Sequence, residues 1–450
     1  MQKSWKPVRE MSSPGLTDPL RRKPFRRLAA TYAINEFGDW MGIVALSVLV
    51  FEQTGSALAT TGLFLGTRFL PSLLAPLLVT RGEKPPPRFA LPVIYCGEAA
   101  AFGALALLAN SFSLAAVIVV ATIDGALALT GRSLTRAVVA ALLEPAGELR
   151  AGNAILNVAF TAGAAVGPGL AGLIVAGFSV QVALLIDAIS FYVIAVLLLT
   201  AGPLPQAEPE EGRVREKVRA GVAYLRDNKT VRQLLIAQGA AFIFFAAVVP
   251  IEVIYAKETL GTSDSGYGLM LASWGAGMVL GSFVFAAIRR APLPVLLFFS
   301  TLAVGAGYLG LALAPTLAWA CAASVLGGAG NGVQWVSAVS AIQELTAAEM
   351  QARVMSVLES IGAAMPGVGI IAGGLITTIA DPRAAFAFAG AGIVVIVLVF
   401  APLVGSGWGR RPAQKDSHSL DGGNGVVLEL IPGAPNPVSG APHAKSNPEG

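Results

Sequence analysis

Apolar residues along this chain come in long runs that are separated by short polar segments. Each run holds about twenty residues, which is the length that an α-helix needs to cross the hydrocarbon core of a bilayer. We identify twelve such runs, six on each side of a longer polar segment. They lie near residues 28–51, 57–80, 89–109, 114–131, 153–176, 180–200, 232–255, 266–288, 292–313, 316–341, 354–380 and 384–404. The pattern predicts an all-α polytopic membrane protein with twelve transmembrane helices.

The composition fits a chain that lies mostly in lipid. Hydrophobic residues make up 55% of the 450 residues and charged residues only 13%, whereas a soluble domain carries about a quarter charged residues. The polar segments divide the chain into a basic N-terminal segment (1–27), a first six-helix bundle (28–202), a connector (203–231), a second six-helix bundle (232–405) and a tail that we expect to be disordered (406–450). We expect no cleaved signal peptide, because the first apolar run is a full span.

The placement of basic residues predicts the orientation of the spans. Eight Lys and Arg residues precede residue 28, and seven more lie between residues 213 and 232. The loops on the opposite side offer only Lys257 and Arg383. Because cytoplasmic loops carry the excess of Lys and Arg, both termini and the connector are predicted to be cytoplasmic.

The two halves of the chain are related in sequence. An offset of 206 residues aligns Leu28 with Leu234, Glu52 with Glu258, and residues 61–66 with 267–272. Six spans, a connector and six similar spans in the same orientation form the parallel-repeat plan of a transporter with a site between its halves. We therefore expect two pseudo-symmetric six-helix bundles.

Two carboxylates in the first span are the first candidates for function. A charged side chain at bilayer depth costs about 2.5–3.5 kcal/mol, so Glu36 and Asp39 need a partner, water or a purpose. Counting from the first hairpin places Asp39 level with Arg68, so these two can form an ion pair. Asp39 either has that structural role or binds a proton or a cationic substrate. Glu36 has only Pro71 at its depth, and it is either a proton carrier or a water-exposed group near the cytoplasmic mouth.

Further charged residues lie in later spans. Asp124 is a second candidate for proton coupling, with a structural polar contact as the alternative. Glu98 lies level with Asp124, and we expect Glu98 and Asp187 to be structural. Glu359 is a candidate for the seam between the halves. Arg132 and Arg136 are expected at the cytoplasmic edge.

The fifth span carries the glycine-rich segment AGAAVGPGLAG, residues 162–172. Gly163, Gly167 and Ala171 are four residues apart, so one helix face is almost bare and allows a neighbouring helix to approach closely. Pro168 lacks an N–H and predicts a bend. The eighth span has a similar stripe in Ser273, Gly277 and Gly281, and we expect the two stripes to face each other, either as a sliding surface or as ordinary tight packing.

These features resemble those of the major facilitator superfamily, and within it the bacterial branch of macrolide exporters and the enterobactin exporter. The resemblance covers about residues 25–405 and rests on GDW (38–40), GELRAGNAIL (147–156), LLIDAISFY (184–192), YLRDNKTVRQLL (224–235) and IQELTAAEMQARVMS (342–356). The residues that match the antiporter motif of that family are Gly163, Gly167, Pro168, Ala171 and Gly172. One departure is the loop TRGEKPPPR (80–88), which lacks the usual Asp and offers Glu83 as a replacement.

The resemblance implies a function and a cavity. It implies a secondary active transporter in the bacterial plasma membrane, a monomer that exports amphipathic, drug-like or macrolide-like molecules in exchange for protons by alternating access. Helices that line the cavity in this family carry Asn35, Gln238, Trp274, Asn331, Gln334 and Trp335 here. The alternatives are a siderophore or lipid exporter, an importer, or a scaffold or sensor of the same fold that does not transport.

Other classes of protein find little support in the sequence. Both histidines, His418 and His443, lie in the tail, and Cys96 and Cys321 are far apart, so we expect no metal site and no catalytic cluster. The chain has no glycine–lysine nucleotide motif, and we expect no cofactor. Its basic residues gather at membrane edges, which argues against nucleic acid as a partner.

Overall fold

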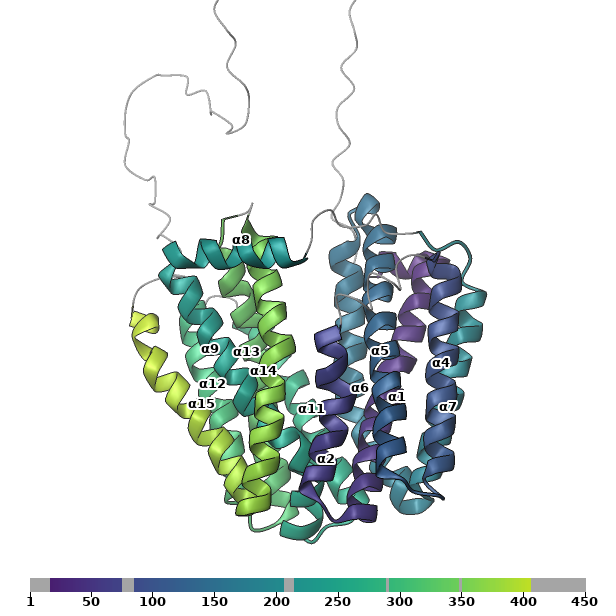
Figure 1. The fold of residues 1–450 in the computed structure, drawn as a ribbon. Helices are drawn as coiled ribbons and strands as arrows, with labels where there is room; N and C mark the ends of the chain where they lie inside the picture. Colours follow the sequence, from purple (N-terminus) through teal and green to yellow (C-terminus); the bar gives the residue numbers. More distant parts are fainter. Residues whose placement is uncertain (1–16, 75–84, 206–213, 289–290, 348–349, 406–450) are drawn as a thin grey trace, which may run out of the picture. The chain divides into compact units, whose positions relative to one another are not determined.

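A computed structural model describes residues 17–74, 85–205, 214–288, 291–347 and 350–405, and every regular element within these ranges is helical (Figure 1). The first half contains α1 (Lys23–Thr54), α2 (Ala57–Phe64), α4 (Pro87–Leu108), α5 (Leu114–Leu143), α6 (Leu149–Gly177) and α7 (Val180–Leu199). The second half contains α8 (Val214–Asp227), α9 (Lys229–Val248), α11 (Asp264–Ala287), α12 (Leu293–Ala312), α13 (Leu317–Glu344), α14 (Gln351–Ile379) and α15 (Pro382–Gly405). The tail, Glu83 and both histidines lie outside the described residues.

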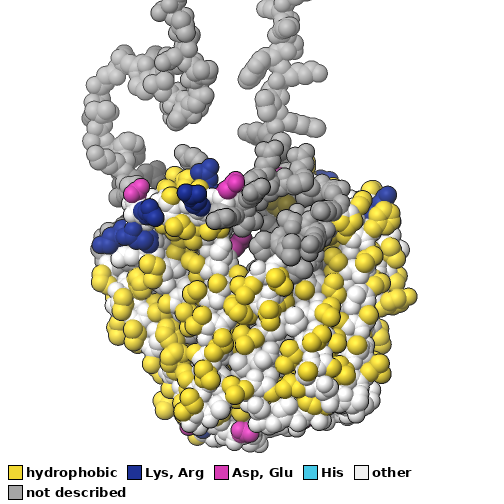
Figure 2. Space-filling model, in the orientation of Figure 1, with side chains coloured by type: hydrophobic (Ala, Val, Ile, Leu, Met, Phe, Trp, Pro, Cys, Tyr) yellow, Lys and Arg dark blue, Asp and Glu magenta, His cyan; other side chains and the backbone are white. Residues whose placement is uncertain are grey.

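The predicted transmembrane architecture is confirmed. Eleven helices in the described ranges are long and apolar enough to cross a membrane. The twelfth predicted span is α13, whose 28 residues make it as long as its neighbours, although glycines and polar residues dilute its apolar character. Figure 2 shows hydrophobic side chains over the middle of one face and Lys and Arg gathered over α8. We call the end where α8 lies the connector end, and the opposite end of the helices the far end.

Two of the spans change their helical geometry on the way. The second span passes from α2 into the π-helical η2 (Leu65–Phe69). The seventh passes from α9 through η4 (Val249–Ile251) and α10 (Glu252–Ile254) into the π-helical η5 (Tyr255–Thr259). A π turn shifts the side chains that follow it around the helix, and such turns are frequent at functional sites. Each of the two π segments carries a basic residue, Arg68 or Lys257.

The connector contains a helix that the sequence analysis did not predict. Apolar Val218 and Leu225 of α8 belong to a cluster with Val354 and Val357 of α14. Gly221 allows this close approach, because a Cβ there would lie 2.5 Å from the backbone oxygen of Arg353. Figure 1 shows α8 lying across the ends of the second-half helices. The segment is rich in charged residues, but its apolar residues recur at helical spacing and form one apolar face.

The seam between the halves is formed mainly by α6 and α11, but its contacts differ from the prediction. Gly163 and Gly167 pack against Glu36 and Trp40 of α1, within the first half. Gly277 and Gly281 pack against α13, within the second half, so the two predicted stripes do not meet. The residues that touch across the seam are Ala164, Pro168, Gly169 and Gly172 of α6, and Asp264, Gly268, Ala272 and Gly275 of α11. The seam therefore involves other faces of α6 and α11 than the sequence analysis predicted, because both glycine stripes pack inside their own bundles.

The close approach of α6 and α11 predicts that Gly172→Leu destabilises the protein. A Cβ at Gly172 would already lie 2.5 Å from the backbone oxygen of Asp264, and overpacking of this kind costs about 1–3 kcal/mol. The thermal unfolding midpoint in detergent should fall. Gly177→Leu at the end of the same helix is the control, because no atom lies within 4 Å of its Cβ position. Equal midpoints for the two variants would contradict this account of the seam.

Candidate functional site

Asp39 of α1 forms its ion pair with Arg132 of α5. The Nη1 of Arg132 donates to Oδ2 of Asp39 over 2.9 Å, and Nδ2 of Asn35 donates to the same oxygen over 3.3 Å. The predicted pair of Asp39 with Arg68 is therefore wrong. Arg132 is also not a helix-end residue, because α5 continues to Leu143. Counting residues from a hairpin gives depth in the membrane, but it does not say which way each helix faces.

Asp39, Arg68, Asp124 and Arg132 nevertheless line one cavity of about 50 Å³ inside the first half. The second span reaches it because α2, η2 and α5 pack closely. A Cβ on Gly66 would meet the Thr122 hydroxyl, and one on Gly125 would meet the Thr67 backbone. The cavity thus gathers two acids and two bases from α1, η2 and α5, with Phe102 of α4 on its wall.

Two further carboxylates are buried behind this cavity. Glu98 of α4 and Asp187 of α7 are both 0% exposed. Within the described part of the chain, neither oxygen of Glu98 has a hydrogen-bond partner, and the same holds for one oxygen each of Asp124 and Asp187. The hydroxyl of Ser190 donates to the other oxygen of Asp187 over 3.1 Å. An uncompensated ionised carboxylate in such surroundings is costly, whereas a carboxyl group that holds a proton is far less so.

The glycine of the GDW segment, Gly38, is required because Asp187 packs directly against it. A Cβ on Gly38 would collide with Oδ1 of Asp187, and one on Gly42 would lie 3.0 Å from Oδ2. Residues without side chains at both positions allow α7 to bring this acid against α1. The expected structural role of Asp187 fits this packing.

The remaining candidates in the first half lie close to the same cluster. Glu36 is only 3% exposed and its Cβ packs against Gly163, so the alternative of a water-exposed group at the mouth is wrong in this conformation. Asn35 is 2% exposed and contacts the cavity only through Asp39.

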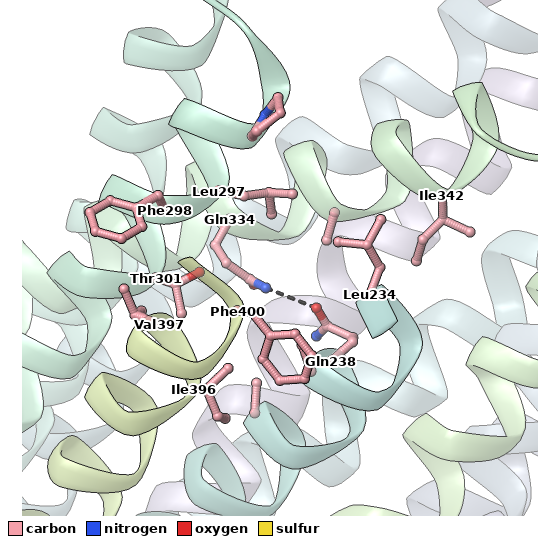
Figure 3. A pocket seen from close by; sticks show the side chains of 14 residues that line it. Leu234, Gln238, Leu297, Phe298, Thr301, Gln334, Ile342, Ile396, Val397 and Phe400 are labelled. Carbon is pink, nitrogen blue, oxygen red and sulfur yellow. Dashed lines mark hydrogen bonds between the residues drawn. The ribbon is translucent and has the colours of Figure 1, made fainter. Parts of the chain in front are cut away.

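The candidates in the second half are dispersed. Gln238 and Gln334 are hydrogen-bonded to each other over 2.8 Å and line a second cavity (Figure 3). Trp274 stacks on Tyr308 with ring centroids 5.1 Å apart and covers Gly327 and Gly328, so it is a packing residue. Glu359 and Trp335 are exposed, Asn331 is half-buried, and none of the three lines either cavity.

An ion-pair network at the far end joins the halves, and the sequence analysis missed it. The Nζ of Lys257 in η5 lies 2.5 Å from a carboxylate oxygen of Glu52 at the end of α1 and 2.6 Å from one of Asp264 at the start of α11. Lys257 was visible as one of only two basic residues on its side of the membrane. Arg383, the other one, instead donates to the backbone oxygens of Ala312 and Ala314 within the second half.

At the connector end, Arg22, which directly precedes α1, forms an ion pair with Glu148. Arg22 donates from Nε to Glu148 over 2.7 Å and from Nη2 over 3.0 Å. This hydrogen bonding lowers the pKa of Glu148 and raises that of Arg22. The contact ties the residues before α1 to the start of α6.

The sequence matches a family model described as Major Facilitator Superfamily twice, over residues 28–251 and 234–446. The chain belongs to the major facilitator superfamily. The two matches begin at the two residues that the offset of 206 aligns. A search of curated proteins gave no match.

Solved structures of transporters share the fold of this superfamily member. The nucleoside transporter NupG aligns with a TM-score of 0.67 at 14% identity, covering 85% of this chain and 99% of that one. The peptide transporter POT gives 0.68 at 14% identity, covering 85% and 95%. The human organic anion transporter MFSD10 gives 0.58 at 18% identity, covering 84% and 99%. Family and fold together indicate a membrane transporter of small molecules and not an enzyme.

The Asp39–Arg132 pair predicts a marked double-mutant effect. Arg132→Gln removes the base that Asp39 contacts directly, and because the pair is partly buried the protein should lose about 1–3 kcal/mol. The double variant Asp39→Asn with Arg132→Gln should recover most of that loss, because no uncompensated charge remains. Chemical or thermal unfolding in detergent measures both effects. Additive losses in the double variant would show that the two side chains do not depend on each other.

Proposed function

We propose that this superfamily member is a proton-coupled exporter of amphipathic small molecules, working as a monomer by alternating access in the bacterial plasma membrane, with its termini and connector in the cytoplasm. The observation that carries the proposal is the cavity of the first half, where Asp39 and Asp124 face Arg68 and Arg132. The buried Glu98 and Asp187 add two further acids to the two acids and two bases of the cavity, and such an excess of acids inside a transporter is suited to bind and release protons.

The balance of charge supports a proton as the coupling ion. Asp39 is neutralised by Arg132 at 2.9 Å, while Glu98 and Asp124 each keep at least one oxygen without a partner in the described structure. Whichever of these groups holds a proton, its loss would leave a charge that attracts Arg68 or Arg132. Such a change alters the forces between α1, η2, α4 and α5, the helices that surround the cavity.

The conformation fits one stage of alternating access. The principal contacts between the halves in the described residues are those of α6 with α11, of α2 and η2 with α14, of α2 with η4, and of α1 with α10. They lie at the far end and in the middle of the helices, and Lys257 adds its bridge to Glu52 at the far end. With the connector end in the cytoplasm, this is a state closed to the outside.

The energetics are sufficient for export. One proton that crosses a potential of 100 mV releases about 2.3 kcal/mol, which supports roughly a fiftyfold concentration gradient. In the proposed cycle a proton enters from outside, neutralises a carboxyl group of the cavity and displaces the exported compound. The halves then close at the far end and the proton leaves toward the cytoplasm.

Removing the coupling acids should abolish concentrative export. In everted vesicles energised with a proton gradient, the native protein should accumulate at least one compound from a panel of dyes, macrolides, siderophores, lipids, nucleosides and peptides. With Asp124→Asn or Asp39→Asn, the roughly fiftyfold gradient should collapse to about onefold, as it should for the native protein with a protonophore.

Glu148→Gln is the matched control, because it neutralises an acid outside the membrane-spanning helices. Accumulation by the Asp124 and Asp39 variants equal to that of Glu148→Gln would overturn proton coupling. A correctly folded protein that moves no compound of the panel would instead favour the scaffold or sensor alternative.

The Lys257 bridge should hold the far end closed. In a background with Cys96→Ser and Cys321→Ser, a cysteine at the buried Ala164, which contacts Gly275 across the seam, reports on opening of the seam. Adding Lys257→Ala should raise its reaction rate with a membrane-impermeant maleimide by roughly two- to tenfold, since a partly buried ion pair contributes on the order of 1 kcal/mol. Arg383→Ala, which removes a base bonded only within the second half, should leave the rate unchanged. The same rate in all three proteins would contradict a closing role for Lys257.

A further inference from the structure

The second half contains a cavity of its own, separate from the acidic one. It has a volume of about 80 Å³ and is lined by residues of α9, α12, α13 and α15 only. No residue of the first half and no residue of the acidic cavity belongs to its lining. What this cavity binds is therefore a question independent of proton coupling.

The walls of the cavity favour a neutral and mainly apolar ligand. Its lining includes Leu234, Leu297, Phe298, Ile396 and Phe400, and none of the lining residues that the structure describes is charged. An ion would lose its hydration without gaining a countercharge there. The volume is well below the roughly 300–1,000 Å³ of a pocket for a whole drug-sized molecule, so one end of a longer ligand fits better.

The polar groups of the cavity are two carboxamides and a hydroxyl. Nε2 of Gln334 donates to Oε1 of Gln238, and the two residues are 9% and 6% exposed (Figure 3). A carboxamide offers two N–H donors and a carbonyl acceptor. One amide therefore keeps its NH₂ group and the other keeps its carbonyl, whichever way the pair is oriented, and neither makes another hydrogen bond in the described structure.

Thr301 adds a third polar group from α12. Other threonines of this protein return their hydroxyl to a backbone oxygen in the preceding turn, as Thr122 does to Ile118 and Thr130 to Ala126. Thr301 lines the cavity and makes no such bond within the described residues. Its hydroxyl is thus available beside the amide pair.

We propose that this cavity binds a neutral amphipathic molecule through a carboxamide or a group with the same adjacent donor and acceptor. The bound group would accept from the free NH₂ of one glutamine and donate to the free carbonyl of the other, while its apolar chain lies among the leucine, isoleucine and phenylalanine side chains. Gln238 and Gln334 both line the cavity, so a ligand of this chemistry can form a hydrogen bond with each of them.

Photolabelling of the full protein in lipid nanodiscs tests the proposal. The probe is an oleamide analogue with a diazirine near its amide, and mass spectrometry locates the label. The label should fall on α9, α12, α13 or α15. Unlabelled oleamide should compete at least tenfold better than methyl oleate, which has the same chain and an acceptor but no N–H donor.

Variants separate amide recognition from apolar packing. Gln238→Leu with Gln334→Leu should reduce labelling about tenfold; because both partners become apolar, the fold should be retained, and the unfolding midpoint checks this. Thr301→Val is a smaller change that should weaken labelling in the same direction. Gln343→Leu, on an exposed glutamine of the same helix, should have no effect.

The outcome that overturns the proposal is equal competition by oleamide and methyl oleate, or labelling that is indifferent to the glutamine and threonine variants. The two cavities share no described lining residue. A failure of proton-coupled export would therefore leave this result standing, and a failure here would leave the coupling proposal standing.

Discussion

A carboxylate and a guanidinium group 2.9 Å apart in the interior of the first bundle constrain much of the structure around them. Asp39 and Arg132 each offset the cost of placing the other's charge inside the bundle, and their contact requires α1 and α5 to meet at this depth. The glycines of the surrounding helices serve the same end. Gly38 and Gly42 make room for Asp187, and Gly66 and Gly125 let the second span bring Arg68 to the cavity. Close packing of small residues is thus what allows a cluster of charged groups to exist inside a membrane protein.

The two halves have the same plan but different chemistry. Both cavities include residues of the first, third and fourth helices of their bundle, but the second span also lines the acidic cavity and α15 also lines the other. The polar groups that line the first cavity include two acids and two bases, whereas those of the second are two carboxamides and a hydroxyl. This difference suits a division of tasks in which one half responds to protons and the other recognises a neutral part of a ligand.

The sequence predicted the spans well, because a run of twenty apolar residues has few other uses, and the structure places a helix at each of the twelve. It identified Asp39 and Asp124 as candidates, since they are rare charges in long apolar segments, and both line the cavity of the first half. It could not predict which side chains face each other. The π turn in η2 rotates Arg68 relative to a regular helix. Arg132 was expected at the edge of the membrane, but α5 continues beyond it to Leu143. The glycine stripes were identified but assigned to the wrong neighbours. Small residues show that another helix packs closely against a face, but they do not show which helix it is. The amphipathic α8 was not predicted because its many charged residues resemble a solvated loop, whereas its few apolar residues recur at helical spacing.

The central claim is that the protonation of the first-half acids determines which end of the transporter is open. Distances between pairs of spin labels in nanodiscs test it most directly, with Cys96 and Cys321 replaced. One pair at Glu144 and Asp227 reports on the connector end, and another at Gln53 and Pro315 reports on the far end. The conformation described here buries Glu98 and Asp124 with oxygens that lack partners, so it should be favoured at low pH. Raising the pH should lengthen the far-end distance and shorten the connector-end distance, and Glu98→Gln with Asp124→Asn should hold both at their low-pH values. Distances that do not change with pH, or that change equally in this variant, would contradict the account.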